Sequence, residues 1–228
     1  MNKSRRNGTA LRDDIFAIKQ ERILQEAVAL FYENGYLPTN VDAIAQQLGA
    51  TKPFVYYHFK RKIDLLVEIC RRTMLEALEV TEDAANLEAD PIPKLADFVR
   101  NFTALILDRY KFVSIYFREQ LNLPDDVNED IFIMRRKIDV ALRKILREGQ
   151  EAGDFHFENT TIASQVVAGM ISYTFAWYQD PGPIAKEAIA RQMLQHVLQS
   201  VGVAPARADE IRDRTVSAGL GPAAANLR

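Results

Sequence analysis

The residues best suited to binding another molecule are gathered between positions 51 and 62 of this 228-residue chain. The group comprises Thr51, Lys52, Pro53, Phe54, Tyr56, Tyr57, His58, Lys60, Arg61 and Lys62. Hydroxyl, imidazole and ammonium groups donate hydrogen bonds to phosphate oxygens, and an apolar side chain such as Phe54 contacts a thymine methyl group. These residue types therefore favour a nucleic-acid partner. The alternative is that the tyrosines are packing residues and His58 an ordinary surface histidine.

The elements that must position this group are two short helices joined by a glycine-containing turn. The pattern predicts helices over 41–48 and 52–58, separated by Gly49-Ala50-Thr51. Thr51 is a suitable N-cap, and Pro53 lies in the first turn, where a missing N–H costs little. This is the geometry of a helix-turn-helix, whose second helix enters the major groove of DNA. On geometry alone, an ordinary helical pair remains the alternative.

Helical periodicity predicts an all-α fold for the remaining chain as well. Before the helix pair, an apolar stripe from Ile23 to Phe31 predicts a helix over about 14–34, ending near Gly35. A fourth helix begins near Lys60 and runs past Leu78. Further helices are expected over 92–107, 112–121, 127–152, 162–178 and 184–201. The 162–178 segment is apolar nearly all round, so it should be buried in the core or in an interface.

The same pattern divides the chain into domains. A DNA-binding domain is expected over 1–62, with the fourth helix continuing to about residue 85, and a ligand-binding and dimerisation domain over 86–203. The acidic, proline-containing stretch 86–93 marks the break between them. Residues 204–228 are rich in Ala, Pro and Gly and are expected to form a fraying tail.

Charge is unevenly distributed along the chain, although its net charge is only −2. Residues 1–62 hold ten Lys/Arg and six Asp/Glu, whereas the rest holds 19 and 25. A basic front on an acidic body is consistent with contact between the first domain and phosphates, although an excess of this size also arises by chance.

Little in the sequence suggests catalysis, a metal or a cofactor. No phosphate loop, dinucleotide fingerprint or nucleophile elbow is present, and His58, His156 and His196 are scattered. The single cysteine, Cys70, lies mid-helix on a partly apolar face and is expected to be a small core residue. No stretch is long and apolar enough for a transmembrane helix, and no signal peptide is recognisable. We therefore expect a cytoplasmic protein that is not an enzyme and has no membrane partner.

The segment from residue 23 to residue 66 resembles the DNA-binding domain of the TetR family of bacterial regulators. The matching residues are ILQEAVALFYENGY (23–36), Thr39 and IAQQLGATKPFVYYHFKRKIDLL (44–66), about a fifth of the chain. The resemblance implies an all-helical homodimer that binds a DNA operator and releases it when a small ligand binds the C-terminal domain. Pro53 departs from the glycine or other small residue that many relatives carry, so the operator sequence does not follow by analogy.

The resemblance also implies roles for individual residues. Thr39 would cap the second helix and contact phosphate, and Lys62 would contact phosphate. Thr51, Lys52, Pro53 and Phe54 would face base edges, with Tyr56, Tyr57 and His58 on backbone or bases. Ile44, Ala45, Leu48, Val55 and Phe59 would be core residues.

The C-terminal body is expected to supply the dimer surface and the ligand pocket. The last two helices would pair between subunits, with Ala163, Ala168, Gly169 and Ser172 allowing close approach; the alternative is that these residues fill the monomer core. Aromatic candidates for the pocket are Phe98, Phe102, Phe112, Tyr116, Phe117, Phe132, Tyr173 and Trp177, although aromatics at helical spacing are more often core. Arg109, Arg118 and Arg135 are candidate partners for an anionic ligand, unless they are simply solvated.

The link from Trp177 to Ile184 and the residues after it resemble those of TetR-like regulators of fatty-acid, sterol or aromatic-acid breakdown. This resemblance implies an acyl-CoA or a related hydrophobic acid as the effector. The competing hypothesis is a helical ligand-binding or scaffold protein without specific DNA binding, and an activator instead of a repressor is a third reading.

Overall fold

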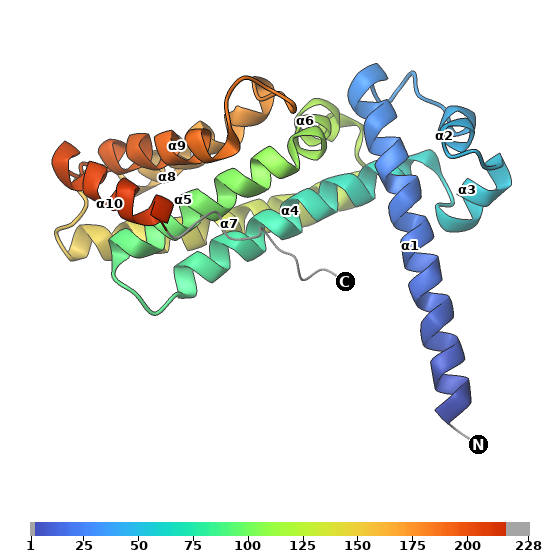
Figure 1. The fold of residues 1–228 in the computed structure, drawn as a ribbon, viewed down its shortest axis with the longest axis horizontal. Coiled ribbons are helices and arrows are strands. Elements are labelled where there is room, and N and C mark those ends of the chain that lie inside the picture. The colour runs from blue at the N-terminus through green and yellow to red at the C-terminus, as the bar shows by residue number, and fades with distance from the viewer. Residues whose placement is uncertain (1–2, 218–228) are drawn as a thin grey trace. The chain divides into compact units, whose positions relative to one another are not determined.

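A computed structural model describes residues 3–217, and every regular element in that range is a helix (Figure 1). The α-helices are α1 (Lys3–Asn34), α2 (Val41–Gln47), α3 (Lys52–His58), α4 (Lys62–Asn86), α5 (Pro91–Asp108), α6 (Tyr110–Glu119), α7 (Asp125–Glu151), α8 (Thr160–Ser172), α9 (Lys186–Ser200) and α10 (Pro205–Ser217). Short 3₁₀ helices, η1 (Gln120–Asn122) and η2 (Tyr173–Ala176), follow α6 and α8. The all-α prediction is confirmed.

The chain forms two compact units whose boundary differs from the predicted break. The first unit contains the residues up to Arg72 together with Ser114–Asn128, and the second contains Thr73–Val113 with the residues from Glu129 onward. The predicted break at 86–93 is the turn between α4 and α5. Both sides of this turn belong to the second unit, because the boundary between the units falls within α4, between Arg72 and Thr73.

The first unit is built on the apolar stripe of α1. Ile23, Leu24, Ala27, Val28 and Phe31 are all buried, as the periodicity predicted. They belong to a core that also takes buried residues from α2, α3 and α4: Ile44, Val55, Leu65, Leu66 and Ile69. Because α2 and α3 each bury one side in this core, their remaining sides are held at the surface.

The second unit has an apolar core of its own, with residues from α4 to α10. Phe98 and Phe102 of α5 lie in it with ring centroids 5.0 Å apart. Gly149 of α7 is packed directly against the buried ring of Phe155, and a Cβ at Gly149 would lie 2.0 Å from Phe155 Cδ2. Close packing of this kind leaves no room for an added methyl group.

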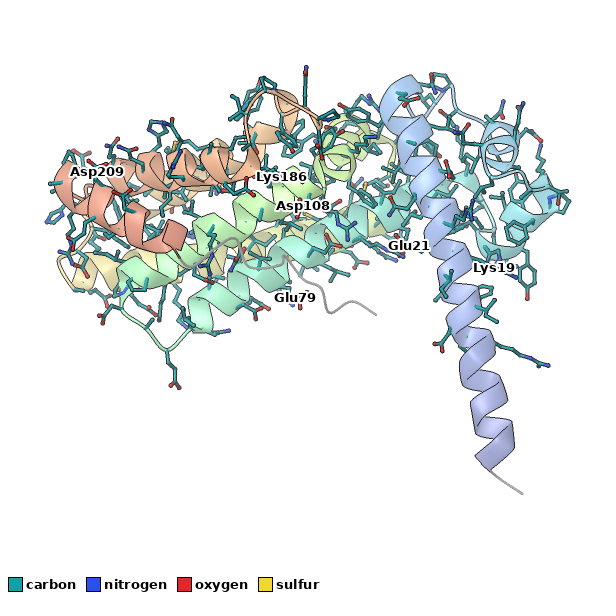
Figure 2. The ribbon with its side chains drawn as sticks, viewed as in Figure 1. Lys19, Glu21, Glu79, Asp108, Lys186 and Asp209 are labelled. Carbon is teal, nitrogen blue, oxygen red and sulfur yellow. The ribbon has the colours of Figure 1, made fainter. Side chains whose placement is uncertain are left out.

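The connection between α8 and α9 is fastened to the end of α5. Tyr178 is buried beside Leu107 and Ile189, and Lys186 forms an ion pair with Asp108 at 2.6 Å (Figure 2). This hydrogen bond to Asp108 raises the pKa of the Lys186 ammonium. Within this connection Tyr178 is therefore buried, whereas Trp177 is exposed.

Within the stretch expected to be a fraying tail, residues 205–217 form α10. Ala208 is fully buried in the core of the second unit, and Gln195 of α9 donates a hydrogen bond to Asp209 at 3.0 Å (Figure 2). Composition alone suggested a loose tail, but Ala208 and the partly buried Ile211 pack this helix against the core. The rest of the predicted tail, residues 218–228, lies outside the described residues.

The predicted helix over 162–178 is buried on only one side. Ala163, Val167 and Ile171 lie in the core of the unit, whereas Ile162 and Tyr173 are 64% and 65% exposed. Of the small residues expected to admit a partner helix, Ala163 thus fills the monomer core. Gly169 is on the exposed side, where open space surrounds its Cβ position.

Candidate DNA-binding surface

Helices α2 and α3 adopt the predicted arrangement of two short helices and a tight turn. Asn40 caps α2, its side-chain oxygen accepting a hydrogen bond from the Ala43 N–H at 2.8 Å. Gly49 has φ +64°, a left-handed conformation that glycine adopts without a steric cost. Thr51 occupies the N-cap of α3 with no side-chain capping bond, and Pro53 follows in the first turn. The hydroxyl of Thr51 is therefore not used in capping α3.

One side of α3 is exposed and carries most of the predicted contact residues. Thr51, Lys52, Pro53, Tyr56 and Tyr57 are exposed, with Tyr57 at 67%. Phe54 is half-buried, between this side and the core. The opposite side is anchored through Val55, which is 1% exposed. The exposed residues therefore form a surface of hydroxyl and ammonium donors on a rigidly packed helix.

Lys52, at the first turn of α3, has a partner within the helix pair. Its Nζ lies 2.7 Å from Asp42 Oδ2 of α2, and both side chains are largely exposed. Hydrogen bonding to Asp42 raises the pKa of Lys52, so the ammonium stays charged. An exposed ion pair contributes little to stability, so a phosphate can replace the carboxylate as the partner of Lys52.

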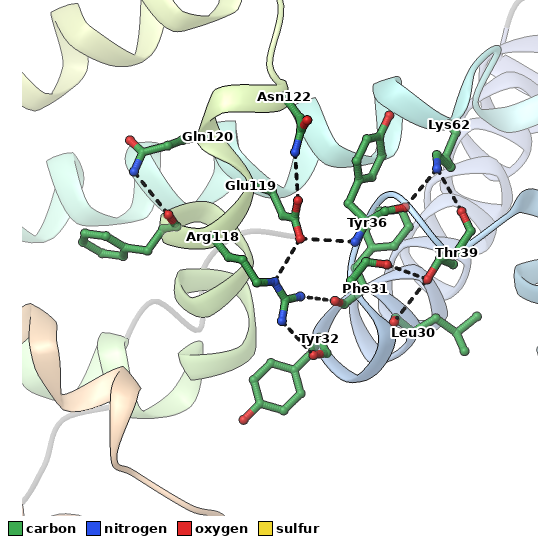
Figure 3. A network of polar contacts seen from close by, with 12 residues as sticks. Leu30, Phe31, Tyr32, Tyr36, Thr39, Lys62, Arg118, Glu119, Gln120 and Asn122 are labelled. Atoms are coloured by element: carbon green, nitrogen blue, oxygen red, sulfur yellow. Dashed lines mark hydrogen bonds and ion pairs between the residues drawn. The ribbon is translucent and has the colours of Figure 1, made fainter.

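Thr39 does not cap the second helix, which corrects the expectation drawn from the resemblance. The residue is buried, and its Oγ1 lies 2.7 Å from the Gly35 carbonyl oxygen and 3.3 Å from that of Leu30 (Figure 3). The last carbonyls of a helix lack intrahelical partners, and the Thr39 hydroxyl supplies one for the end of α1. Asn40, the next residue, takes the capping role.

Lys62 points into the first unit, although the resemblance implied a phosphate contact. Its Nζ donates to the carbonyl oxygens of Tyr36, Leu37 and Thr39 at 2.9, 3.2 and 2.9 Å (Figure 3). The ammonium also lies 4.2 Å from the centroid of the Tyr36 ring. Burial lowers the pKa of Lys62. Its three hydrogen atoms are thus committed to the turn between α1 and α2.

His58 is the third residue whose position differs from the expected contact. It is only 8% exposed and packs against Phe16, Phe54 and Tyr57, with ring centroids 4.5, 5.1 and 5.1 Å away. Its Nδ1 has no hydrogen-bond partner among the described residues. Burial, with a smaller effect from Lys19, lowers the pKa of His58 and favours the neutral imidazole. The residue therefore packs against α3 and α1 from behind the exposed side of α3.

A polar network at the end of α6 was missed by sequence reasoning (Figure 3). Glu119 is buried and accepts hydrogen bonds from the Tyr36 N–H at 3.2 Å and from Arg118 Nε at 2.9 Å. Arg118 also donates to the carbonyl oxygens of Phe31 and Tyr32. The network therefore joins α6 to the C-terminal end of α1. Glu119 does not stand out in the sequence, and Arg118 was considered only as an anion partner, because their partners here are backbone groups more than 80 positions away.

The eight aromatic candidates for a ligand pocket are not brought together. Four are buried: Phe98, Phe102, Phe112 and Tyr116. Four are exposed: Phe117, Phe132, Tyr173 and Trp177. Of the three arginines named with them, Arg109 makes two hydrogen bonds to Glu76 at 3.1 Å, Arg118 belongs to the network above, and Arg135 is exposed.

The described side chains and helices offer neither a metal site nor a membrane-spanning helix. Within residues 3–217, no group of three or more His, Cys, Asp or Glu side chains is placed to hold a metal ion, and no helix there is long and apolar enough to cross a membrane.

Cys70 is fully buried, and burial raises the pKa of its thiol to about 12. Cys70 is thus a core residue, as predicted.

Comparison with known proteins gives consistent matches along the chain. Residues 23–69 match the family described as bacterial regulatory proteins, tetR family, and residues 88–201 match the tetracyclin repressor-like C-terminal domain. The HTH-type transcriptional repressor KstR2 of Mycolicibacterium smegmatis is 27% identical, over 81% of this chain and 91% of the relative. The fatty acid metabolism regulator protein of Bacillus subtilis is 25% identical, over 80% and 95%.

A solved structure shows the same fold. AibR, in complex with isovaleryl coenzyme A and operator DNA, superposes with a TM-score of 0.70 at 23% identity, over 79% of this chain and 98% of AibR. Together, the two family matches cover both the helix-turn-helix and most of the second unit. The chain belongs to the tetR family of bacterial regulatory proteins, and is therefore a DNA-binding transcription regulator and not an enzyme.

Proposed function

We propose that the protein represses transcription by binding a palindromic operator as a homodimer, and that a small hydrophobic acid or acyl-CoA-like effector releases it. The observation that carries this proposal is the exposed side of α3. Thr51, Lys52, Pro53, Tyr56 and Tyr57 lie together on it, while Val55 and His58 anchor the helix from behind. In a helix-turn-helix, the second helix presents its N-terminal residues to base edges in the major groove.

The roles within this surface follow from the side chains. The Thr51 hydroxyl and the Lys52 ammonium lie at the N-terminus of α3, where backbone N–H groups and the helix dipole also favour a phosphate. Tyr56 and Tyr57 donate hydrogen bonds to oxygens of the DNA backbone. Such contacts set the register of the protein on the DNA without specifying sequence. Pro53 and Phe54 offer apolar surface for a base edge. Thr39, His58 and Lys62 hold the domain together and leave DNA contact to their neighbours.

A homodimer is supported by the exposed stripe of α8 and η2. Ile162, Val166, Tyr173 and Trp177 recur at helical spacing and are 45–65% exposed, with Gly169 between them. A contiguous exposed apolar face marks a protein–protein contact, and a glycine in its middle allows a second helix to approach closely. A two-fold dimer matches an operator whose half-sites are one helical turn of DNA, about 34–36 Å, or a multiple apart.

The effector class is supported by the names of relatives. One regulates fatty acid metabolism, and AibR was solved with isovaleryl coenzyme A. Both are similar to this chain over about four-fifths of its length. An apolar acid or thioester is also compatible with the largely apolar second unit.

The decisive experiment measures fluorescence anisotropy of labelled DNA from the region upstream of the coding sequence, against scrambled DNA and across a salt series. We expect sequence-selective binding, and a loss of at least tenfold in Lys52→Gln and in Tyr56→Ala, because each removes a phosphate or base contact. Arg147→Gln, an exposed arginine of the second unit, is the matched control. Equal binding to both DNAs, lost at moderate salt, would leave only nonspecific electrostatics and support the scaffold hypothesis.

A second experiment tests the dimer. Sedimentation of Ile162→Asp should show a monomer, because a charge replaces an apolar contact in the stripe, whereas Leu121→Asp, at a position 93% exposed in the first unit, should sediment as wild type. A dimer that persists in Ile162→Asp and in Val166→Asp would place the interface elsewhere.

A further inference from the structure

The second unit contains an open groove between the end of α4 and the outer side of α7. Its volume is about 570 Å³, which lies within the 300–1,000 Å³ typical of small-molecule sites. Of the eight aromatic candidates, the groove contains only Phe132, whereas Phe98 and Phe102 lie in the core of the unit.

The floor of the groove is apolar and faces solvent. Phe132, Ile133 and Val140 of α7 line it and are 63%, 52% and 49% exposed. Positions 132, 133, 136, 137, 140 and 144 follow the three- and four-residue spacing of one helix face. Three large apolar side chains thus lie uncovered on the same face of α7. Such a patch, bounded by polar residues, is typical of a binding site.

The groove is also positively charged. Arg136, Lys137 and Lys144 line it, against a single acid, Glu82 of α4. Lys144 donates to Asn86 Oδ1 at 3.3 Å, and no described residue forms an ion pair with Arg136 or Lys137.

Several other basic side chains of the same unit do form ion pairs with acidic side chains. Lys94 pairs with Glu148 at 2.7 Å and Arg109 with Glu76 at 3.1 Å. The groove therefore differs from its surroundings in combining an uncovered apolar floor with cations that no described acid neutralises. A ligand that is complementary to both features is an amphipathic anion.

We infer that this groove binds a small amphipathic anion, with its apolar chain or ring against Phe132 and Val140 and its acidic head group on Arg136 and Lys137. The guanidinium and ammonium groups recognise a carboxylate or phosphate by charge-assisted hydrogen bonds. The inference deepens the proposed function, on which its regulatory meaning rests, by giving the effector a site and a chemical class. The proposed anion partners are thus Arg136 and Lys137 of α7, in place of Arg109, Arg118 and Arg135.

The test uses the full chain, isothermal calorimetry, and dodecyl phosphate below its micellar concentration. Dodecanol and dodecyltrimethylammonium serve as probes with the same chain and a neutral or positive head group. We expect dodecyl phosphate to bind and the cation not to bind. Arg136→Gln/Lys137→Gln should weaken binding of dodecyl phosphate at least tenfold, because each charge-assisted bond is worth about a factor of ten. Phe132→Ala should weaken binding of both dodecyl phosphate and dodecanol.

Arg135→Gln is the matched control, since this arginine is an exposed neighbour on α7 that does not line the groove. Equal binding of dodecanol and dodecyl phosphate, or wild-type affinity in the double variant, would overturn the inference. So would binding confined to vesicles of anionic phospholipid and lost in the double variant, because the face would then recognise a lipid surface. Calorimetry requires no DNA, so failure of operator binding would count against the proposed function alone.

Discussion

Replacing Lys62 by methionine separates a structural role from DNA contact. The substitution keeps the aliphatic stem and removes the ammonium, which donates to the carbonyl oxygens of Tyr36, Leu37 and Thr39 at 2.9, 3.2 and 2.9 Å. These three bonds hold the turn that leads from α1 into α2. Without them, the carbonyl groups must find water, and the turn loses its only charged donor among the described residues.

The size of the effect follows from these contacts. A hydrogen bond to a charged group contributes about 1.5–3 kcal/mol. The three bonds share one half-buried ammonium, and water can reach the freed carbonyl groups, so their contributions do not add. We expect Lys62→Met to lower the free energy of unfolding by about 2–3 kcal/mol, including a smaller contribution from the Tyr36 ring.

The assay combines urea denaturation with amide hydrogen exchange, which locates the loss in α2 and the preceding turn. The salt dependence of operator binding is the second readout. A lysine that contacts phosphate contributes about −0.9 to the slope of log affinity against log salt. We expect an unchanged slope in Lys62→Met. Lys60→Met, an exposed neighbour, should leave the free energy of unfolding unchanged.

A variant with wild-type stability and a slope reduced by about one would refute this reasoning. It would mean that the ammonium leaves the turn and binds the operator, as the resemblance implied.

Three further predictions concern other buried groups. The pKa of His58 is lowered in the fold, so its stabilising contribution is complete above the unfolded value of about 6.5 and is lost as pH falls through the folded value. The free energy of unfolding should therefore decrease more between pH 7 and pH 5 in wild type than in His58→Phe. An equal decrease in both proteins would contradict a lowered pKa of His58. Gly149→Ala should cost about 1–3 kcal/mol, because the new methyl group would meet the Phe155 ring, and thermal unfolding of the variant checks this. Cys70, with a thiol pKa of about 12 and no exposed surface, should resist iodoacetamide at pH 8 in the native protein and react fully in urea; rapid native labelling would show that the core opens.

The sequence alone determined the features that depend on neighbouring residues. The stripe from Ile23 to Phe31, the turn at Gly49 and the start of α3 at Lys52 were all predictable, because apolar spacing and capping act within a few residues. The family resemblance then predicted that α3 faces DNA, which periodicity alone cannot do.

Tertiary structure decided which donors remain free for a ligand. Thr39 and Lys62 have the right chemistry for phosphate, yet their hydrogen atoms are used by carbonyl groups of the turn after α1. His58 is removed from the surface by three aromatic rings. A hydroxyl or ammonium group binds whichever acceptor the fold brings near, so residue type could not distinguish these partners from DNA.

The same reason applies to the second unit. An amphipathic α7 was predictable from its sequence, but which of its faces would be covered depends on helices that are distant in the chain. Packing buries Leu142, Ile145 and Leu146 and leaves Phe132 and Val140 beside uncompensated cations. Apolar periodicity shows that a face exists, and only the arrangement of its neighbours determines whether that face becomes core or binding surface.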